Sequence, residues 1–229
     1  MTPLQRFVSW CGLVLIAVVL GGVYRNRLSR ICRWFPAYLL AVLVAELAIM
    51  LWSKQLFNWE FYVTKEAVYG VLKLILAIDL GATMFAAFPG AAATARHASL
   101  LALSCICAVL VAAHPAGARL DDLAVELQPR LANGTAFLLL TLWGLAIFYH
   151  VPTHRFHRAI LAGLSAYLLL ATVIVGYFVL PHSPIHELAS LANSFGYLVL
   201  LAYWIWEAWR PEPPAPGSPD VMRRLQPWR

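Results

Sequence analysis

Apolar stretches that are each about as long as a membrane is thick dominate this chain of 229 residues. A helix needs about 20 apolar residues to cross the hydrocarbon core of a bilayer. The composition agrees, because 62% of the residues are hydrophobic and 12% are charged, whereas a soluble chain is about a quarter charged. The apolar stretches are continuous and do not alternate with polar residues, which excludes the strands of an outer-membrane barrel. We therefore expect an all-α, multi-pass membrane protein.

Seven membrane spans are expected within a single domain, residues 1–210. Turn residues such as Pro89-Gly90 and Pro181 separate the apolar stretches. The expected spans are 7–23, 36–53, 66–88, 97–113, 132–149, 158–180 and 187–209. Residues 211–229 are rich in proline and then basic, so we expect a disordered tail there.

The positions of the arginines predict the orientation of this seven-helix bundle. With seven spans, the arginine-rich first, third and fifth loops and the tail all fall on one side of the membrane. Loops rich in Lys and Arg face the cytoplasm. We therefore expect the N-terminus outside and the C-terminus in the cytoplasm, and the short loops favour a bacterial inner membrane. The expected cytoplasmic set is Arg25, Arg27, Arg30, Arg33, Arg96, Arg155, Arg158, Arg210, Arg223, Arg224 and Arg229.

An odd number of spans allows a plan of three helices, a linker helix and three more helices. Short matches are compatible with such a repeat: Tyr38-Leu-Leu-Ala in the second span is similar to Tyr167-Leu-Leu-Leu-Ala in the sixth. The plan resembles that of the SWEET sugar transporters over most of the chain. The resemblance concerns topology alone, because the Pro-Gln signature of that family is absent. Both a true repeat and a chance similarity stay open.

The third span carries three ionisable residues, Glu66, Lys73 and Asp79. A charged side chain at the centre of a membrane helix costs about 2.5–3.5 kcal/mol on insertion scales, so such residues are normally paired. On a helix, Glu66, Tyr69 and Lys73 share one face, whereas Asp79 points to nearly the opposite side. Neither face can lie against lipid, and we expect this helix to be central in the bundle.

The depths of polar residues predict a polar layer in the outer half of the bundle. At about 1.5 Å per residue, Glu46 and Lys73 both lie roughly 10 Å below the outer surface, and we expect them to form an ion pair. Thr172 reaches a similar depth, and Asp79 lies deeper as a candidate proton site. A stripe of polar residues with helical spacing on the seventh span would close the layer. The candidate site residues are Glu46, Glu66, Tyr69, Lys73, Asp79, Thr172, Asn193, Ser194 and Tyr197.

Two interpretations of this layer remain open from the sequence. A cavity there would bind a small polar molecule or hold a titrating carboxylate, as in a proton-coupled carrier or a receptor-like protein. Alternatively, the polar residues only join helices, and the chain is a non-catalytic accessory or scaffold subunit whose basic loops contact anionic lipid or a membrane-protein partner. Metal motifs, nucleophile motifs and haem-binding histidines within spans are not found. We expect no enzyme, no cofactor, no metal and no nucleic-acid partner, despite the net charge of +6.

Overall fold

The computed structural model describes residues 3–56, 58–85, 93, 97, 104, 120–151, 153–178 and 185–211. Within these residues the chain forms six long helices and two short helical segments, and no strand is present. The expected all-α class is confirmed for this part of the chain. The elements are α1 (Pro3–Arg25), η1 (Leu28–Arg30), α2 (Trp34–Leu51), α3 (Ser53–Leu56), α4 (Trp59–Phe85), α6 (Leu120–Phe148), α7 (Arg155–Phe178) and α8 (Ile185–Trp209).

All six long helices begin before the expected spans, and the difference is largest for α4 and α6. The third expected span starts at 66, but α4 already begins at Trp59, so Lys65 lies within the helix and not in a connecting loop. The fifth expected span starts at 132, but α6 begins at Leu120 and includes the acidic residues Asp121, Asp122 and Glu126. The fourth expected span, 97–113, lies outside the described residues except for residues 97 and 104, and so does almost all of the expected tail.

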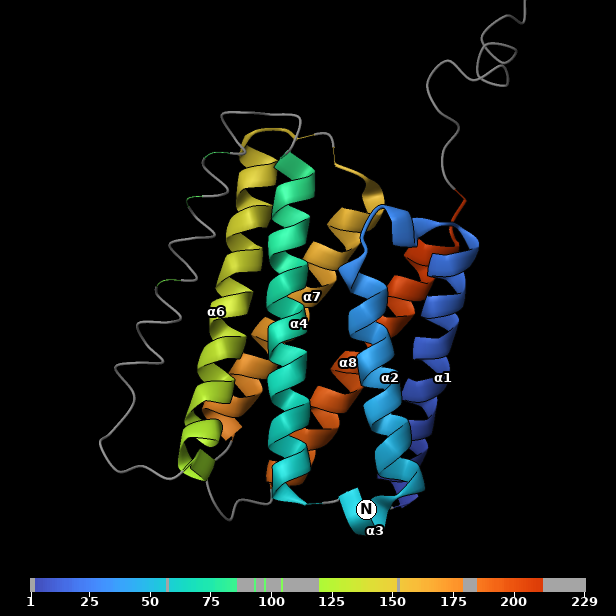
Figure 1. The fold of residues 1–229 in the computed structure, drawn as a ribbon, viewed down its shortest axis with the longest axis vertical. Coiled ribbons are helices and arrows are strands. Elements are labelled where there is room, and N and C mark those ends of the chain that lie inside the picture. Colours follow the sequence, from blue (N-terminus) through green and yellow to red (C-terminus); the bar gives the residue numbers. More distant parts are fainter. Residues whose placement is uncertain are drawn as a thin grey trace, which may run out of the picture.

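The six long helices form a closed ring (Figure 1), in which each helix packs against the next. The order around the ring is α1, α2, α4, α6, α7 and α8, which returns to α1. Helices α1, α4, α6 and α8 run in one direction, and α2 and α7 run back between them. We call the end at which α1 begins the proximal end of the ring and the end at which α1 finishes the distal end.

The inner faces of the helices are apolar, and so are many of the outer faces. On α1 the buried residues Leu13, Ile16 and Val23 recur at helical spacing and form one stripe toward the interior. Large apolar side chains also point outward, including Phe148 at 74% and Val199 at 69% exposure. A soluble monomer rarely exposes so much contiguous apolar surface, whereas hydrocarbon would cover it at no cost.

Within the residues that the structure describes, four helices are long and apolar enough to cross a membrane. They contain the spans Arg6–Arg25, Trp34–Leu51, Glu60–Phe85 and Arg155–Ile174, and a shorter apolar stretch covers Asn133–Phe148 in α6. The helices and their apolar outer surface are thus compatible with a membrane-embedded protein.

Aromatic side chains fill the ring toward its distal end. Phe35 on α2 meets Trp204 on α8 edge to face, with ring centroids 4.9 Å apart. The same Phe35 ring lies 5.4 Å from Phe156 on α7, again nearly perpendicular. All three side chains are fully buried, and the Trp204 indole N–H donates to the carbonyl of Ala159 at 3.3 Å. This cluster joins three helices across the interior and leaves no space between them.

Polar contacts to helix ends close the distal end. The Asn26 side chain donates to the carbonyl of Ala208 at 2.6 Å, and the Trp209 indole donates to the carbonyl of Val18 at 3.0 Å. Both contacts join α1 to the last turn of α8. Arg155 at the start of α7 donates to the carbonyls of Arg210 and Pro211 beyond the end of α8. Because the last carbonyls of a helix lack partners within the helix, the Asn26 side chain satisfies a carbonyl of α8 that would otherwise be unpaired.

Candidate functional site

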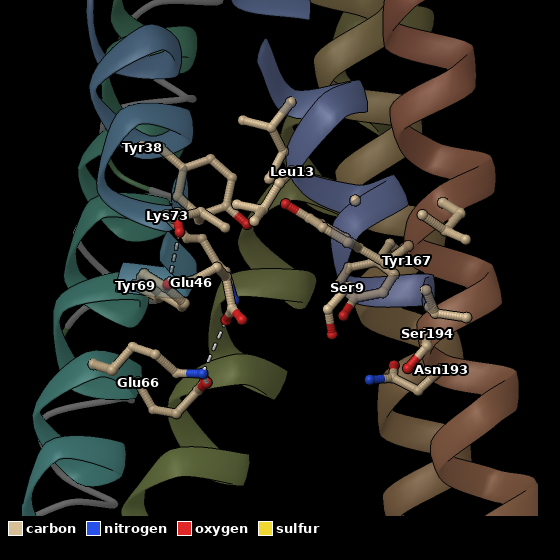
Figure 2. Close-up of a pocket in the computed structure, with 17 residues that line it drawn as sticks. Ser9, Leu13, Tyr38, Glu46, Glu66, Tyr69, Lys73, Tyr167, Asn193 and Ser194 are labelled. Carbon is tan, nitrogen blue, oxygen red and sulfur yellow. Dashed lines mark hydrogen bonds and ion pairs between the residues drawn. The ribbon is translucent and has the colours of Figure 1, made fainter. Parts of the chain in front are cut away.

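A cavity of about 240 Å³ occupies the interior toward the proximal end, where the ring is not filled. Five helices contribute to its wall: α1, α2, α4, α7 and α8. Figure 2 shows Lys73 and Glu66 on one side of this space, facing Asn193 and Ser194 on the other. Of the nine candidate residues from the sequence, all but Asp79 and Thr172 line this cavity. The lining candidates are Glu46, Glu66, Tyr69, Lys73, Asn193, Ser194 and Tyr197.

Lys65 is the basic partner of both carboxylates in the cavity. Its ammonium nitrogen lies 3.2 Å from Glu46 Oε1 and 3.7 Å from Glu66 Oε1. The same ammonium also lies 5.6 Å from the ring centroids of Tyr62 and Tyr69, within the range of a cation–π contact. The Lys65 side chain is 12% exposed, so these groups replace most of its water.

The expected ion pair between Glu46 and Lys73 is wrong. The two residues do line one cavity, but the cation in contact with Glu46 is Lys65, because α4 begins at Trp59 and therefore holds Lys65 within the helix. Among the described residues, no hydrogen bond or ion pair involves the Lys73 ammonium. Lys73 therefore brings a donor group to the cavity for which the described part of the chain offers no acceptor.

Four tyrosines surround the cavity, two of which the sequence analysis did not select. Tyr38 on α2 lies 6.4 Å from Tyr69 on α4 between ring centroids, and Tyr167 on α7 lies 5.5 Å from Tyr197 on α8. The Tyr69 hydroxyl donates to the carbonyl of Val42 at 3.4 Å. The missed residues, Tyr38 and Tyr167, were visible only as the start of the two similar sequence stretches, which gave no indication that both would face one space.

Two buried polar atoms of α8 have no hydrogen-bond partner. They are the Asn193 side-chain oxygen, which can only accept, and the Tyr197 hydroxyl, which can donate and accept. Both residues line the cavity. A buried polar group without a partner costs about 1–3 kcal/mol, so these atoms and the Lys73 ammonium favour a polar molecule or ordered water inside the cavity.

Thr172 and Asp79 lie away from the cavity. The Thr172 hydroxyl donates to the side-chain oxygen of Asn133 at 2.6 Å, on an exposed surface between α7 and α6. Asp79 is on the distal part of α4, within electrostatic range of Cys32 and of the buried ring of His157. These two candidates therefore belong to contacts between helices and not to the same site as Glu46.

Burial is the main influence on the Cys32 thiol, which lies between η1 and α2. Desolvation raises the pKa of Cys32 to about 12, and the nearby Asp79 carboxylate adds to the increase. A thiol in this environment stays protonated at neutral pH and is a poor nucleophile. His157 uses its Nε2 for a contact of 3.2 Å with the carbonyl of Ile31. This Cys, His and Asp neighbourhood is thus a packed structural region.

The cavity offers charged and phenolic groups but no metal ligand set. Within the described residues, no group of three His, Cys, Asp or Glu side chains could hold a metal ion. Two carboxylates, two ammonium groups, four phenols and an amide can bind a small polar molecule through hydrogen bonds and charge. No protein-family model, curated protein or solved structure matches this chain, so a function must be inferred from the geometry of the cavity.

Proposed function

We propose that this chain is a seven-span protein of a bacterial inner membrane that binds a small polar molecule in the proximal cavity, as a carrier or a receptor-like protein. The observation that supports binding most strongly is the pair of buried polar atoms without a partner, the Asn193 oxygen and the Tyr197 hydroxyl. The Lys73 ammonium lines the same cavity and makes no ion pair with a described residue. If the interior served only to hold the helices together, side chains would fill it densely. The distal half of the ring is filled in this way around the buried Trp204.

The directions of the helices support seven spans. Helices α4 and α6 run the same way in Figure 1, so the chain between Phe85 and Leu120 has to return from one end of the ring to the other. That stretch contains the apolar segment 97–113, which is long enough to cross a bilayer as a helix. With this additional span, α1 and α8 place the two termini on opposite sides.

The charge distribution supports a cytoplasmic distal end. Exposed arginines gather there on the connection between α1 and α2 and beside the end of α8, and such positive loops face the cytoplasm. The cavity then lies in the outer half of the membrane, with Glu46 and Lys65 nearest the outer surface. The exposed arginines of the distal end are Arg25, Arg27, Arg30, Arg33, Arg158 and Arg210.

The same arginine-rich end supports a second candidate function. Four exposed arginines on one short connection would attract anionic headgroups or an acidic partner by about 1 kcal/mol each near a membrane surface. A non-catalytic scaffold subunit could use that surface and leave the cavity filled with water. Neither candidate function requires catalysis, and we propose a binding protein and not an enzyme.

Retention of small molecules by the purified protein in lipid nanodiscs tests the binding function. The wild-type chain, Lys73→Met and the control Thr172→Val are each incubated with a mixture of small polar metabolites, washed and analysed by mass spectrometry. We expect at least one compound to stay with the wild type and with Thr172→Val but not with Lys73→Met. A compound retained in this way would then be tested for uptake into proteoliposomes, which separates a carrier from a receptor-like protein.

The opposite outcome would favour the scaffold. If no compound is retained by the wild type, and if Lys73→Met folds and behaves like the wild type in membranes, the cavity has no ligand. Lipid-binding assays with the arginines of the distal end replaced by glutamine would then become the relevant measurement.

A further inference from the structure

The proximal part of the cavity has an excess of negative charge. Lys65 contacts both Glu46 and Glu66, at 3.2 Å and 3.7 Å, so a single ammonium is shared between two carboxylates. With all three groups ionised, this cluster carries a net charge of about −1, since each group contributes one unit. The Asn193 oxygen, an acceptor without a partner, lines the same cavity from α8. This part of the wall is therefore suited to a cationic hydrogen-bond donor.

The deeper part of the cavity has the opposite character. Lys73 is about two helical turns further along α4 than Glu66, roughly 10 Å toward the distal end. Helix α8 runs in the same direction (Figure 1), so Tyr197 lies about one turn deeper than Asn193. The Lys73 ammonium has no hydrogen bond or ion pair with any residue that the structure describes, and the Tyr197 hydroxyl can donate a hydrogen bond. This part of the wall is suited to an anion.

The geometry points to a small zwitterion as the ligand, with its carboxylate at Lys73 and Tyr197 and its ammonium group at Glu66 and Asn193. This inference rests on the proposed binding function and specifies the chemical class of the ligand. The protein groups hold the two charges of the ligand in one orientation, because each end of the cavity attracts one sign and repels the other.

The total charge of the cavity supports a zwitterion over a singly charged ligand. Two carboxylates and two ammonium groups sum to zero, so a net anion or cation would add an uncompensated charge within the membrane. A zwitterion leaves the sum at zero and gives the Lys73 ammonium the close anionic acceptor that no described residue supplies. A neutral polyol would satisfy hydrogen bonds but would give the Lys73 ammonium no anionic acceptor.

The size of the cavity limits the ligand to the size of an amino acid or a small peptide. Its volume is about 240 Å³, below the range of about 300–1,000 Å³ that is typical of sites for drug-sized ligands. The volume corresponds to about eight water molecules at their share of the liquid, about 30 Å³ each. Four tyrosine rings around this space provide flat apolar surfaces for the carbon atoms of such a molecule.

A panel of matched compounds tests the charge requirement with the full-length protein in nanodiscs. One arm contains the neutral L-amino acids and the ω-amino acids from glycine to 6-aminohexanoate, which vary the separation of the two charges. The other arms contain the amines, the carboxylates and the neutral diols of the same chain lengths. Binding is measured by isothermal titration calorimetry. We expect at least one zwitterion to bind at least about tenfold more tightly than both its matched amine and its matched carboxylate, as for a charge-assisted hydrogen bond.

A substitution at Lys73 provides a readout that a folding defect would not imitate. In Lys73→Gln, affinity for the zwitterion is expected to fall at least about tenfold, while affinity for the matched amine changes less than about twofold. Lys73→Arg keeps the charge and is expected to keep the preference for the zwitterion. The control is Asp79→Asn, which removes a charge from the same helix outside the cavity and is expected to leave every affinity unchanged.

The possible outcomes separate this inference from the proposed function. An amine, carboxylate or diol that binds as tightly as its matched zwitterion would overturn the inference while supporting a ligand site. Equal losses for the zwitterion and the amine in Lys73→Gln would also overturn it. If no compound of any class binds, the inference fails, and the retention of metabolites described above decides the proposed function independently.

Discussion

Replacing Lys65 by methionine should destabilise the protein more than any other single substitution of a charged residue in the cavity. At an effective dielectric constant of about 20, unit charges 3.2 Å and 3.7 Å apart attract by about 5 and 4.5 kcal/mol. Desolvation of the three groups offsets most of this attraction, and removing one partner of a buried ion pair typically costs about 3–5 kcal/mol. Glu46 and Glu66 retain side-chain exposures of 32% and 23%, so water screens them in part and we expect about 3 kcal/mol.

Thermal unfolding in nanodiscs, followed by tryptophan fluorescence, measures this effect. A loss of about 3 kcal/mol corresponds to a decrease in Tm of roughly 6–12 °C for a chain of this length. Lys73→Met is the matched control, because it removes a cavity lysine that has no ion pair among the described residues, and it should leave the stability unchanged or raise it.

A double-mutant cycle identifies the partner of Glu46. We expect a coupling free energy of about 1–3 kcal/mol between Lys65→Met and Glu46→Gln. The reasoning is refuted if this coupling is zero within error, or if the cycle between Lys73→Met and Glu46→Gln gives the larger coupling.

Three further predictions concern the distal half and the thiols. Trp204→Ala should lower the unfolding free energy by about 3–5 kcal/mol, because a large buried side chain leaves a cavity; an unchanged Tm would contradict the described packing. Gly163→Ala should destabilise by about 1–3 kcal/mol, since a Cβ atom there would lie 2.6 Å from Leu200 Cδ1; the same unfolding assay would show a neutral substitution if the helices were further apart. Cys32 should resist alkylation by iodoacetamide at pH 8, because a pKa of about 12 leaves roughly one thiol in ten thousand ionised; mass spectrometry that found rapid modification in the folded protein would contradict its burial.

The long apolar helices and the level of the polar residues could be predicted from the sequence, because the length of an apolar stretch and the rise per residue are both read directly from it. The rise per residue places Glu46 and Lys73 at one depth, and both line the cavity in the structure. The helical spacing of Asn193, Ser194 and Tyr197 likewise predicted one face, and all three line the same space. These predictions needed only the direction and period of each helix.

The contacts between helices could not be predicted in the same way. The choice of Lys65 over Lys73 as the partner of Glu46 depends on where α4 begins, and the ends of helices are set by local contacts that the apolar pattern does not reveal. Thr172 shares the predicted depth but faces Asn133 on α6, because depth does not determine the rotation of a helix about its axis.

The most direct test of a polar, ligand-accessible interior is the reactivity of single cysteines toward a membrane-impermeant maleimide added from outside intact cells. Ser194→Cys lies in the cavity wall, and Val199→Cys lies on the outer face of the same helix with 69% exposure to the surroundings of the ring. In a background without the native cysteines, we predict that Ser194→Cys is modified and that Val199→Cys, covered by lipid, is not. Equal protection of both cysteines would contradict an open cavity, and modification of Val199→Cys alone would contradict the membrane-embedded arrangement of α8.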